Sequence, residues 1–245
     1  MSSETSARLP PMPAIRAVAF DLDDTLWAIG PVIERAERLL YAWLHEHCPR
    51  LTERFSLQDL RAARSALAAE QPHRAHDYTY MRMTVLERHA VGCGYTAAHA
   101  AEAFAVFHAA RNELDLFEDV RPALERLRSR YRLATLSNGN ADLRRIGIAR
   151  YFDASLTARE LGAQKPDSRC FESLARALDL EPAQILYVGD DPLLDVEGAR
   201  ACFLRTAWMN RRKALWPDSL AKPGYVVSDC AELAALLLAA EVERC

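Results

Sequence analysis

The sequence lacks the features that mark several large classes of protein. Its formal net charge is only −3 over 245 residues, whereas proteins that bind nucleic acid through phosphate contacts usually carry a strong positive charge. None of its six cysteines belongs to a Cys-x-x-Cys pair, and no histidine cluster has the spacing of a zinc finger. We therefore expect a small-molecule partner rather than nucleic acid, with room for a local basic pocket that holds phosphate.

Long hydrophobic runs are absent too. The amino-terminal segment MSSETSARLPPMPAIR has no apolar stretch of the kind that a signal peptide contains. The segment ELAALLLAAEVER is charged at both ends and too short to cross a bilayer, so we interpret it as a helix packed on a core. We therefore expect no membrane association and a cytoplasmic location, where free thiols are ordinary buried side chains.

Half of the residues are apolar, which is enough for a sizeable core. Residues 1–13 are polar and proline-rich and predict a flexible arm. The apolar run Ala17–Phe20 predicts a strand that is buried on both faces. Apolar residues then recur at helical spacing in four segments, which predict an all-helical block covering residues 32–47, 57–70, 77–91 and 96–110.

Strands and helices alternate after residue 117. We predict helices over residues 120–130, 140–152, 167–179, 192–203 and 231–242, and strands over residues 131–137, 155–158, 185–190, 205–210 and 225–228. This alternation predicts an α/β fold, a doubly wound parallel sheet with helices on both faces. Because the first strand precedes the helical block, we divide the chain into a core domain of residues 14–30 and 112–245 and an inserted all-α domain of residues 31–111.

An acidic cluster, Asp21-Leu22-Asp23-Asp24-Thr25, directly follows the first predicted strand. Open α/β sheets bind their ligands beyond the carboxyl ends of the strands. Asp21 and Asp23 can converge there, where their charges repel unless a cation or a shared proton intervenes. A divalent metal would resolve the repulsion, with one carboxylate attacking phosphorus and the other handling the proton of the leaving group. An acidic cap on the next helix is the alternative interpretation.

Two polar segments follow later strands. Ser137-Asn138-Gly139 ends the predicted strand 131–137, and a hydroxyl with backbone N–H groups at such a turn suits a phosphate oxygen. Taken alone, this segment is better explained as a helix cap. Lys165 lies in a loop before a predicted helix and could neutralise a phosphate, although alone it would be interpreted as a solvated surface lysine.

A fourth segment follows the predicted strand 185–190. Gly189 allows a tight turn, after which Asp190 can project into the same crevice, with Asp195 on the next turn. An acidic helix cap is again the alternative, and it suits Asp191 in particular.

Together, the order and spacing of the four segments resemble the motifs of the haloacid dehalogenase superfamily. The resemblance covers essentially residues 15–245, and the helical block resembles the C1 cap of that superfamily. It implies that Asp21 is the nucleophile that forms an aspartyl-phosphate, and that Asp23 is the general acid and then the base that activates water. The residues that would hold the phosphoryl group are Thr25, Ser137, Asn138 and Lys165. The implied Mg²⁺ ligands are Asp21, the backbone carbonyl of Asp23, and Asp190, with Asp191 and Asp195 as supporting residues.

Other activities of the same superfamily stay open. A haloacid dehalogenase uses no metal and typically lacks an acidic residue at the positions of Asp23 and Asp190, so a phosphatase is favoured. A phosphomutase runs the same first half-reaction. A non-catalytic binding protein would be expected to have lost one of the catalytic groups, and none is missing.

The substrate would be a small phosphate ester chosen by the cap. Trp27 could stack on a flat ring or pack a hinge, and Tyr78 and Arg82 lie in a polar-aromatic segment that could line the pocket. The stretches FDLDDTLWAIGPVIERAE, SNGNADL and VGDDPLLDVEGA resemble bacterial phosphatases that act on flavin mononucleotide and on the phosphoribitylamino-uracil precursor of riboflavin. Hydrolysis of sugar phosphates or phosphoglycolate remains the alternative.

Overall fold

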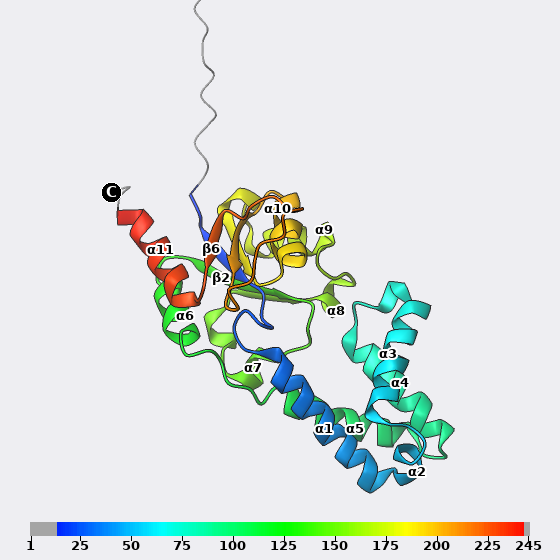
Figure 1. Ribbon diagram of the computed structural model, residues 1–245. Coiled ribbons are helices and arrows are strands. Elements are labelled where there is room, and N and C mark those ends of the chain that lie inside the picture. Colours follow the sequence, from blue (N-terminus) through cyan, green and yellow to red (C-terminus); the bar gives the residue numbers. More distant parts are fainter. Residues whose placement is uncertain (1–13, 243–245) are drawn as a thin grey trace, which may run out of the picture.

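The computed structural model describes residues 14–242, with side chains through residue 239, and is built on a six-stranded sheet (Figure 1). All the strands are parallel and lie in the order β3-β2-β1-β4-β5-β6. They are β1 (Ala17–Phe20), β2 (Arg132–Ser137), β3 (Ala154–Thr157), β4 (Ile185–Gly189), β5 (Arg205–Met209) and β6 (Tyr225–Val227). The strand order reverses beside β1, where doubly wound sheets bind their ligands. The predicted fold class is confirmed.

Helices lie on both faces of this sheet. The helices of the core domain are α6 (Val120–Arg128), α7 (Leu143–Ile146), α8 (Ala158–Leu161), α9 (Ser168–Leu178), α10 (Gly198–Ala201) and α11 (Cys230–Val242). The helices of the inserted domain are α1 (Ile29–His47), α2 (Pro49–Thr52), α3 (Leu57–Glu70), α4 (Tyr78–Gly92) and α5 (Ala97–Arg111). Among residues 14–242, none of the helices combines the length and the hydrophobicity that a bilayer crossing requires.

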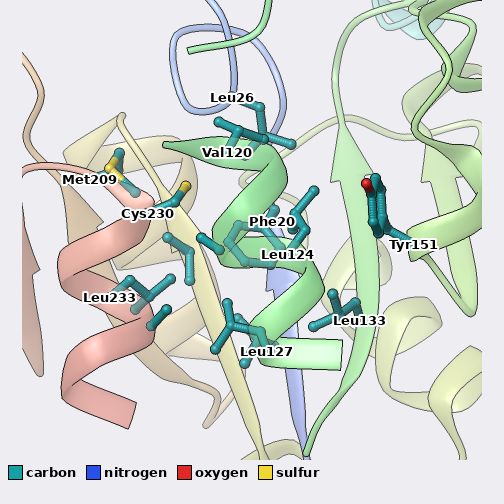
Figure 2. Packing of buried hydrophobic residues seen from close by; sticks show 14 of the residues in the cluster. Phe20, Leu26, Val120, Leu124, Leu127, Leu133, Tyr151, Met209, Cys230 and Leu233 are labelled. Carbon is teal, nitrogen blue, oxygen red and sulfur yellow. The ribbon is translucent and has the colours of Figure 1, made fainter. Parts of the chain in front are cut away.

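Strand β1 is buried on both faces, as its apolar run predicted. Its side chains alternate between two apolar clusters, because successive strand residues point to opposite faces. Val18 and Phe20 belong to the cluster beneath α6 and α11, whereas Ala17 and Ala19 belong to the cluster beneath α9. Figure 2 shows Phe20 packed among side chains of α6 and α11. The sheet therefore holds the end of β1, and with it Asp21, in a rigid frame.

The inserted domain has an apolar cluster of its own. That cluster draws all its residues from 33–110, while the two clusters of the core domain draw none from residues 31–111. Helices α1 and α5 connect the two domains and lie side by side, since the Arg35 guanidinium donates to the Ala110 carbonyl over 3.0 Å (Figure 1). The division at residues 31 and 111 stays a prediction. The predicted flexible arm, residues 1–13, lies outside the described residues.

Two predicted helices are wrong in their extent. The segment 140–152 forms only α7 and a 3₁₀ turn, η2 (Ala149–Tyr151), because Gly147 takes a left-handed conformation (φ 80°) that ends α7. The segment 192–203 begins as a π-helical turn, η4 (Pro192–Glu197), and continues as α10 to Ala201. Both differences lie beside the carboxyl ends of the strands, where the polar segments gather.

Candidate active site

A buried lysine lies between two carboxylates at the end of β1. The Lys165 ammonium donates to Asp21 Oδ1 over 2.6 Å and to Asp195 Oδ1 over 2.5 Å. Lys165 is 3% exposed, and both aspartates are buried as well. The Asp21 N–H donates to the Val188 carbonyl of β4, so the sheet itself positions this carboxylate. The sequence alone would have allowed Lys165 to be a surface residue, and the structure excludes that interpretation.

Tyr187 completes this buried cluster. Its hydroxyl accepts a hydrogen bond from the Lys165 ammonium over 3.0 Å and donates to the Leu136 carbonyl over 2.8 Å. Burial raises the pKa of Asp21 well above its ordinary value; the charge of Lys165 opposes the shift, and the charge of Asp195 adds to it. The pKa of Lys165 is itself raised well above its ordinary value: burial opposes the shift, but the charges of Asp195 and Asp21 outweigh it. The lysine is therefore a permanent cation at this position.

A group of three carboxylates surrounds a space suited to a metal ion. One oxygen each of Asp21, Asp190 and Asp195 lies within 4.8 Å of the others. Burial, together with the charges of Asp195 and Asp24, raises the pKa of Asp190 to about 7. The Thr25 hydroxyl lies 3.4 Å from both Asp21 Oδ2 and Asp190 Oδ1. Lys165 neutralises one negative charge of the three, so a divalent cation would balance the group, and carboxylate oxygens are the ligands that Mg²⁺ prefers.

Asp23 is turned toward a second cation. The Arg111 guanidinium donates to both Asp23 oxygens, over 2.7 and 3.0 Å, and the Trp27 indole donates to Asp23 Oδ1 over 2.8 Å. Asp24 adopts a left-handed conformation (φ 61°), and its N–H donates to the Trp27 carbonyl, so the chain folds back and brings the indole onto Asp23. Trp27 is 0% exposed. This burial favours the packing role considered for Trp27 over the stacking role.

Ser137 lies close to Asp23 at the end of β2. Its hydroxyl oxygen accepts a hydrogen bond from the Gly139 N–H over 3.0 Å. A Cβ atom on Gly139 would lie 2.6 Å from Asp23 Oδ2 and 3.2 Å from Ser137 Oγ, so this close approach requires glycine. The structure thus brings the Ser137 hydroxyl and the Asp23 carboxylate to one crevice.

The side chains of Asn138 and Asp191 form hydrogen bonds with backbone groups of nearby segments. Asn138 accepts a hydrogen bond from the Lys165 N–H over 2.8 Å and donates to the Lys165 carbonyl over 3.1 Å. The direct phosphate contact predicted for Asn138 is corrected to this positioning of Lys165. Asp191 accepts hydrogen bonds from the N–H groups of Leu193 and Leu194 and caps η4, which was the alternative considered for it.

Tyr78 and Arg82 lie in the inserted domain and line a cavity that also reaches Asn140 of the core domain. Tyr78 is half-exposed. Burial and the charge of Asp23 raise the pKa of Tyr78, and the charge of Lys165 opposes the shift. Arg82 is instead bound to Glu37 over 3.1 Å.

Sequence reasoning missed Arg111 and Tyr187. Arg111 directly follows the predicted helix 96–110, and no sequence pattern indicated that its side chain would be buried at 1% exposure. Tyr187 lies within a predicted strand, and only its phenolic oxygen in an otherwise apolar run could have indicated a buried polar partner.

A parallel sheet that ends in a nucleophilic carboxylate, a buried lysine and a second acidic group defines a class of α/β hydrolases. The family model of haloacid dehalogenase-like hydrolases matches residues 15–202. The chain belongs to this family.

Several known proteins are similar to it. The 5-amino-6-(5-phospho-D-ribitylamino)uracil phosphatase YigB of Escherichia coli is 32% identical over 93% of this chain and 98% of its own. A phosphoserine phosphatase of Thermus thermophilus is 34% identical over 57% of this chain and 58% of its own. A crystal structure of a 2-haloacid dehalogenase from Pseudomonas syringae superposes with a TM-score of 0.86 at 35% identity, covering 93% of this chain and 99% of that one. With the family match, these relatives identify the chain as an enzyme of the phosphatase type, as the sequence predicted.

Proposed function

We propose that this enzyme hydrolyses a small phosphomonoester through an aspartyl-phosphate on Asp21, with Mg²⁺ as its cofactor. The observation that carries the proposal is the contact of Lys165 with Asp21 inside a group of three carboxylates. An ammonium in this place can neutralise a phosphoryl group, and its charge opposes the rise in the pKa of Asp21 that burial causes.

The chain's own residues supply each step. An oxygen of Asp21 attacks phosphorus, the ester bond breaks, and the leaving oxygen takes a proton from Asp23. Asp23 then takes a proton from water, whose oxygen attacks phosphorus and releases Asp21 and inorganic phosphate. Ser137 and Lys165 hold the phosphoryl oxygens throughout.

Magnesium fits the acidic group on charge and on ligand type. Asp21 and Asp190 would hold it with the backbone carbonyl of Asp23, while Asp195 is already bound to Lys165 and to the Asp191 N–H. The bound ion would offset the negative charge of the incoming phosphate.

The substrate that the comparisons favour carries a ribityl phosphate. YigB, which matches nearly the whole chain, is named for the phosphoribitylamino-uracil, and flavin mononucleotide shares that phosphorylated chain. Sugar phosphates and phosphoglycolate are the alternative substrates of the same mechanism. A location in the cytoplasm would suit such metabolites.

A 2-haloacid dehalogenase is the second candidate, favoured by the similarity to the Pseudomonas syringae structure. It would use Asp21 to displace a halide from carbon and would need no metal. The acidic pair Asp23 and Asp190 argues against it, because a dehalogenase has no use for either carboxylate.

The test compares wild-type enzyme with Asp21→Asn on p-nitrophenyl phosphate and on 2-chloropropionate. We expect Mg²⁺-dependent phosphate release by the wild type, a loss of at least about a thousandfold in Asp21→Asn, and no chloride release. Asp218→Asn, at an exposed aspartate, is the matched control and should keep full activity. Phosphate release that persists in excess chelator, or in Asp21→Asn, would overturn the mechanism.

A further inference from the structure

The inserted domain contains a cavity that the phosphoryl chemistry does not use. Its volume is about 240 Å³, which suits one ring or one small polar group. The polar residues that line it are Arg64, Ser65, Tyr78, Arg82 and Asn140, and its apolar wall includes Ile33, Met81 and Phe107. The cavity thus joins α1, α3, α4 and α5 of the inserted domain to the loop after β2.

Three arginines share one carboxylate beside this cavity. Glu37 is 1% exposed and binds Arg61 over 2.5 Å, Arg64 over 2.6 Å and Arg82 over 3.1 Å. Three positive charges against one negative charge leave an excess of two. A buried carboxylate needs one such partner for neutrality, so two of the three cations exceed what Glu37 requires.

Arg64 and Arg82 line the cavity, and each keeps donors that are not bound to Glu37. Each donates one hydrogen bond, to Glu37 Oε1, and no other hydrogen bond of either guanidinium is found among the described residues. Arg82 lies flat against Phe107, with its guanidinium carbon 3.6 Å from the ring centre, so its orientation is fixed. Burial and the charge of Arg64 lower the pKa of Arg82 to about 10, which leaves it charged at neutral pH.

The cavity is linked to the reacting groups. Asn140, on its wall, donates to the Thr79 hydroxyl over 3.1 Å and accepts a hydrogen bond from Arg111 over 3.3 Å. Arg111 in turn binds Asp23, the residue that meets the leaving group. A leaving group that departs toward Asp23 would therefore extend past Tyr78 and Asn140 into the cavity.

We propose that this cavity binds the end of the leaving group remote from the phosphate, and that Arg64 and Arg82 recognise an oxygen-rich acceptor there. A carboxylate and the dicarbonyl edge of a pyrimidinedione share this chemistry, and both accept from a guanidinium. The inference rests on the proposed phosphatase function and adds to it a class of substrate. Phosphate esters that end in a hydroxymethyl group would leave both arginines unsatisfied and would be poor substrates.

Two matched pairs of substrates test this. Flavin mononucleotide carries a pyrimidinedione edge that ribitol 5-phosphate lacks, and 6-phosphogluconate carries a carboxylate that glucitol 6-phosphate lacks. We expect wild-type enzyme to prefer the acceptor-bearing member of at least one pair by about 10- to 100-fold in kcat/KM, the effect of one charge-assisted hydrogen bond. The pair that shows the preference identifies the acceptor.

Arg64→Gln is the decisive variant, with Arg61→Gln as its matched control. Both arginines come from α3 and bind Glu37, but only Arg64 lines the cavity. Arg64→Gln should abolish the preference, whereas Arg61→Gln should keep it and should hydrolyse p-nitrophenyl phosphate like the wild type. Arg82→Gln, checked by thermal unfolding, should behave like Arg64→Gln.

Three results would overturn the proposal: no preference in either pair by the wild type, equal effects of Arg64→Gln and Arg61→Gln, or an equal loss on p-nitrophenyl phosphate. The phosphatase function is judged separately, because it fails only if p-nitrophenyl phosphate is not hydrolysed by the wild type.

Discussion

At the scale of single residues, Arg111 connects the two domains chemically. It is the last residue of α5, yet its guanidinium is buried against Asp23 and lies 5.9 Å from the centre of the Trp27 ring. Its Nη1 atom is buried without a hydrogen-bond partner in the described part of the chain. A buried donor left unpaired is costly, so the position of Arg111 is maintained by its contact with Asp23.

Arg111→Gln should therefore impair proton transfer. We expect kcat to fall by about 100-fold, the lower end of the range for general acid–base catalysis, with little change in fold. Arg111→Lys keeps the charge and should restore part of the activity. A purely structural role would instead lower thermal stability and leave kcat of the folded enzyme unchanged.

The sequence predicted the candidate site residues that gather at the carboxyl edge of the sheet. Asp21, Lys165 and Asp190 were assigned from motif order, and the structure brings them to one edge of the sheet. The roles of Trp27 and Asn138 were harder to predict from the sequence. Whether a side chain faces a ligand or the protein's own groups depends on loop geometry. Arg111 comes from a different domain, and no local pattern could place it against Asp23.

At the scale of elements, the turn from β4 into η4 sets the position of Asp195. A Cβ atom on Gly189 would lie 2.3 Å from Asp195 Cγ, closer than any real contact. The six-residue π-helical turn then carries Asp195 back onto the Asp191 N–H over 3.0 Å. Periodicity predicted a helix here but not this wider turn, because it reports which residues are apolar and not how the backbone winds.

Gly189→Ala should displace Asp195 and loosen Lys165. We expect a loss of about 1–3 kcal/mol in the free energy of unfolding and a fall of about 100-fold in kcat, the effect of a misplacement of about 1 Å. Gly30→Ala is the control, since a Cβ atom there meets nothing within 4 Å and alanine favours a helix. Urea unfolding measures the change in stability, and phosphate release measures the change in kcat. Normal turnover by Gly189→Ala would show that Asp195 can shift without loss of activity.

At the scale of the whole molecule, the inserted segment contributes Arg111 to the candidate site, while the other groups come from the core. Asp21, Ser137, Lys165 and Asp190 all lie outside residues 31–111, and the apolar clusters of the two domains share no residue. Helices α1 and α5 meet where Arg35 binds the Ala110 carbonyl, so a short linker can join residues 30 and 111.

Replacement of residues 31–110 by a glycine–serine linker should leave a folded core that retains Arg111. We expect slow hydrolysis of p-nitrophenyl phosphate and no discrimination among metabolite phosphates, because the groups that exclude water and contact the leaving group are gone. Steady-state kinetics on a substrate panel measures this. An Asp21→Asn version of the shortened chain is the control. Retained discrimination would place specificity in the core domain.

The burial of Lys165 also determines which lysines of the protein can react with acylating reagents. The sequence contains three lysines, and Lys213 and Lys222 are exposed on the segment between β5 and β6. Reagents that acylate amines need a neutral nitrogen within reach, and Lys165 is enclosed and bound as a cation by Asp21 and Asp195. Coupling of lysines to an activated resin or a dye would therefore proceed through Lys213 and Lys222 and spare the Lys165 ammonium.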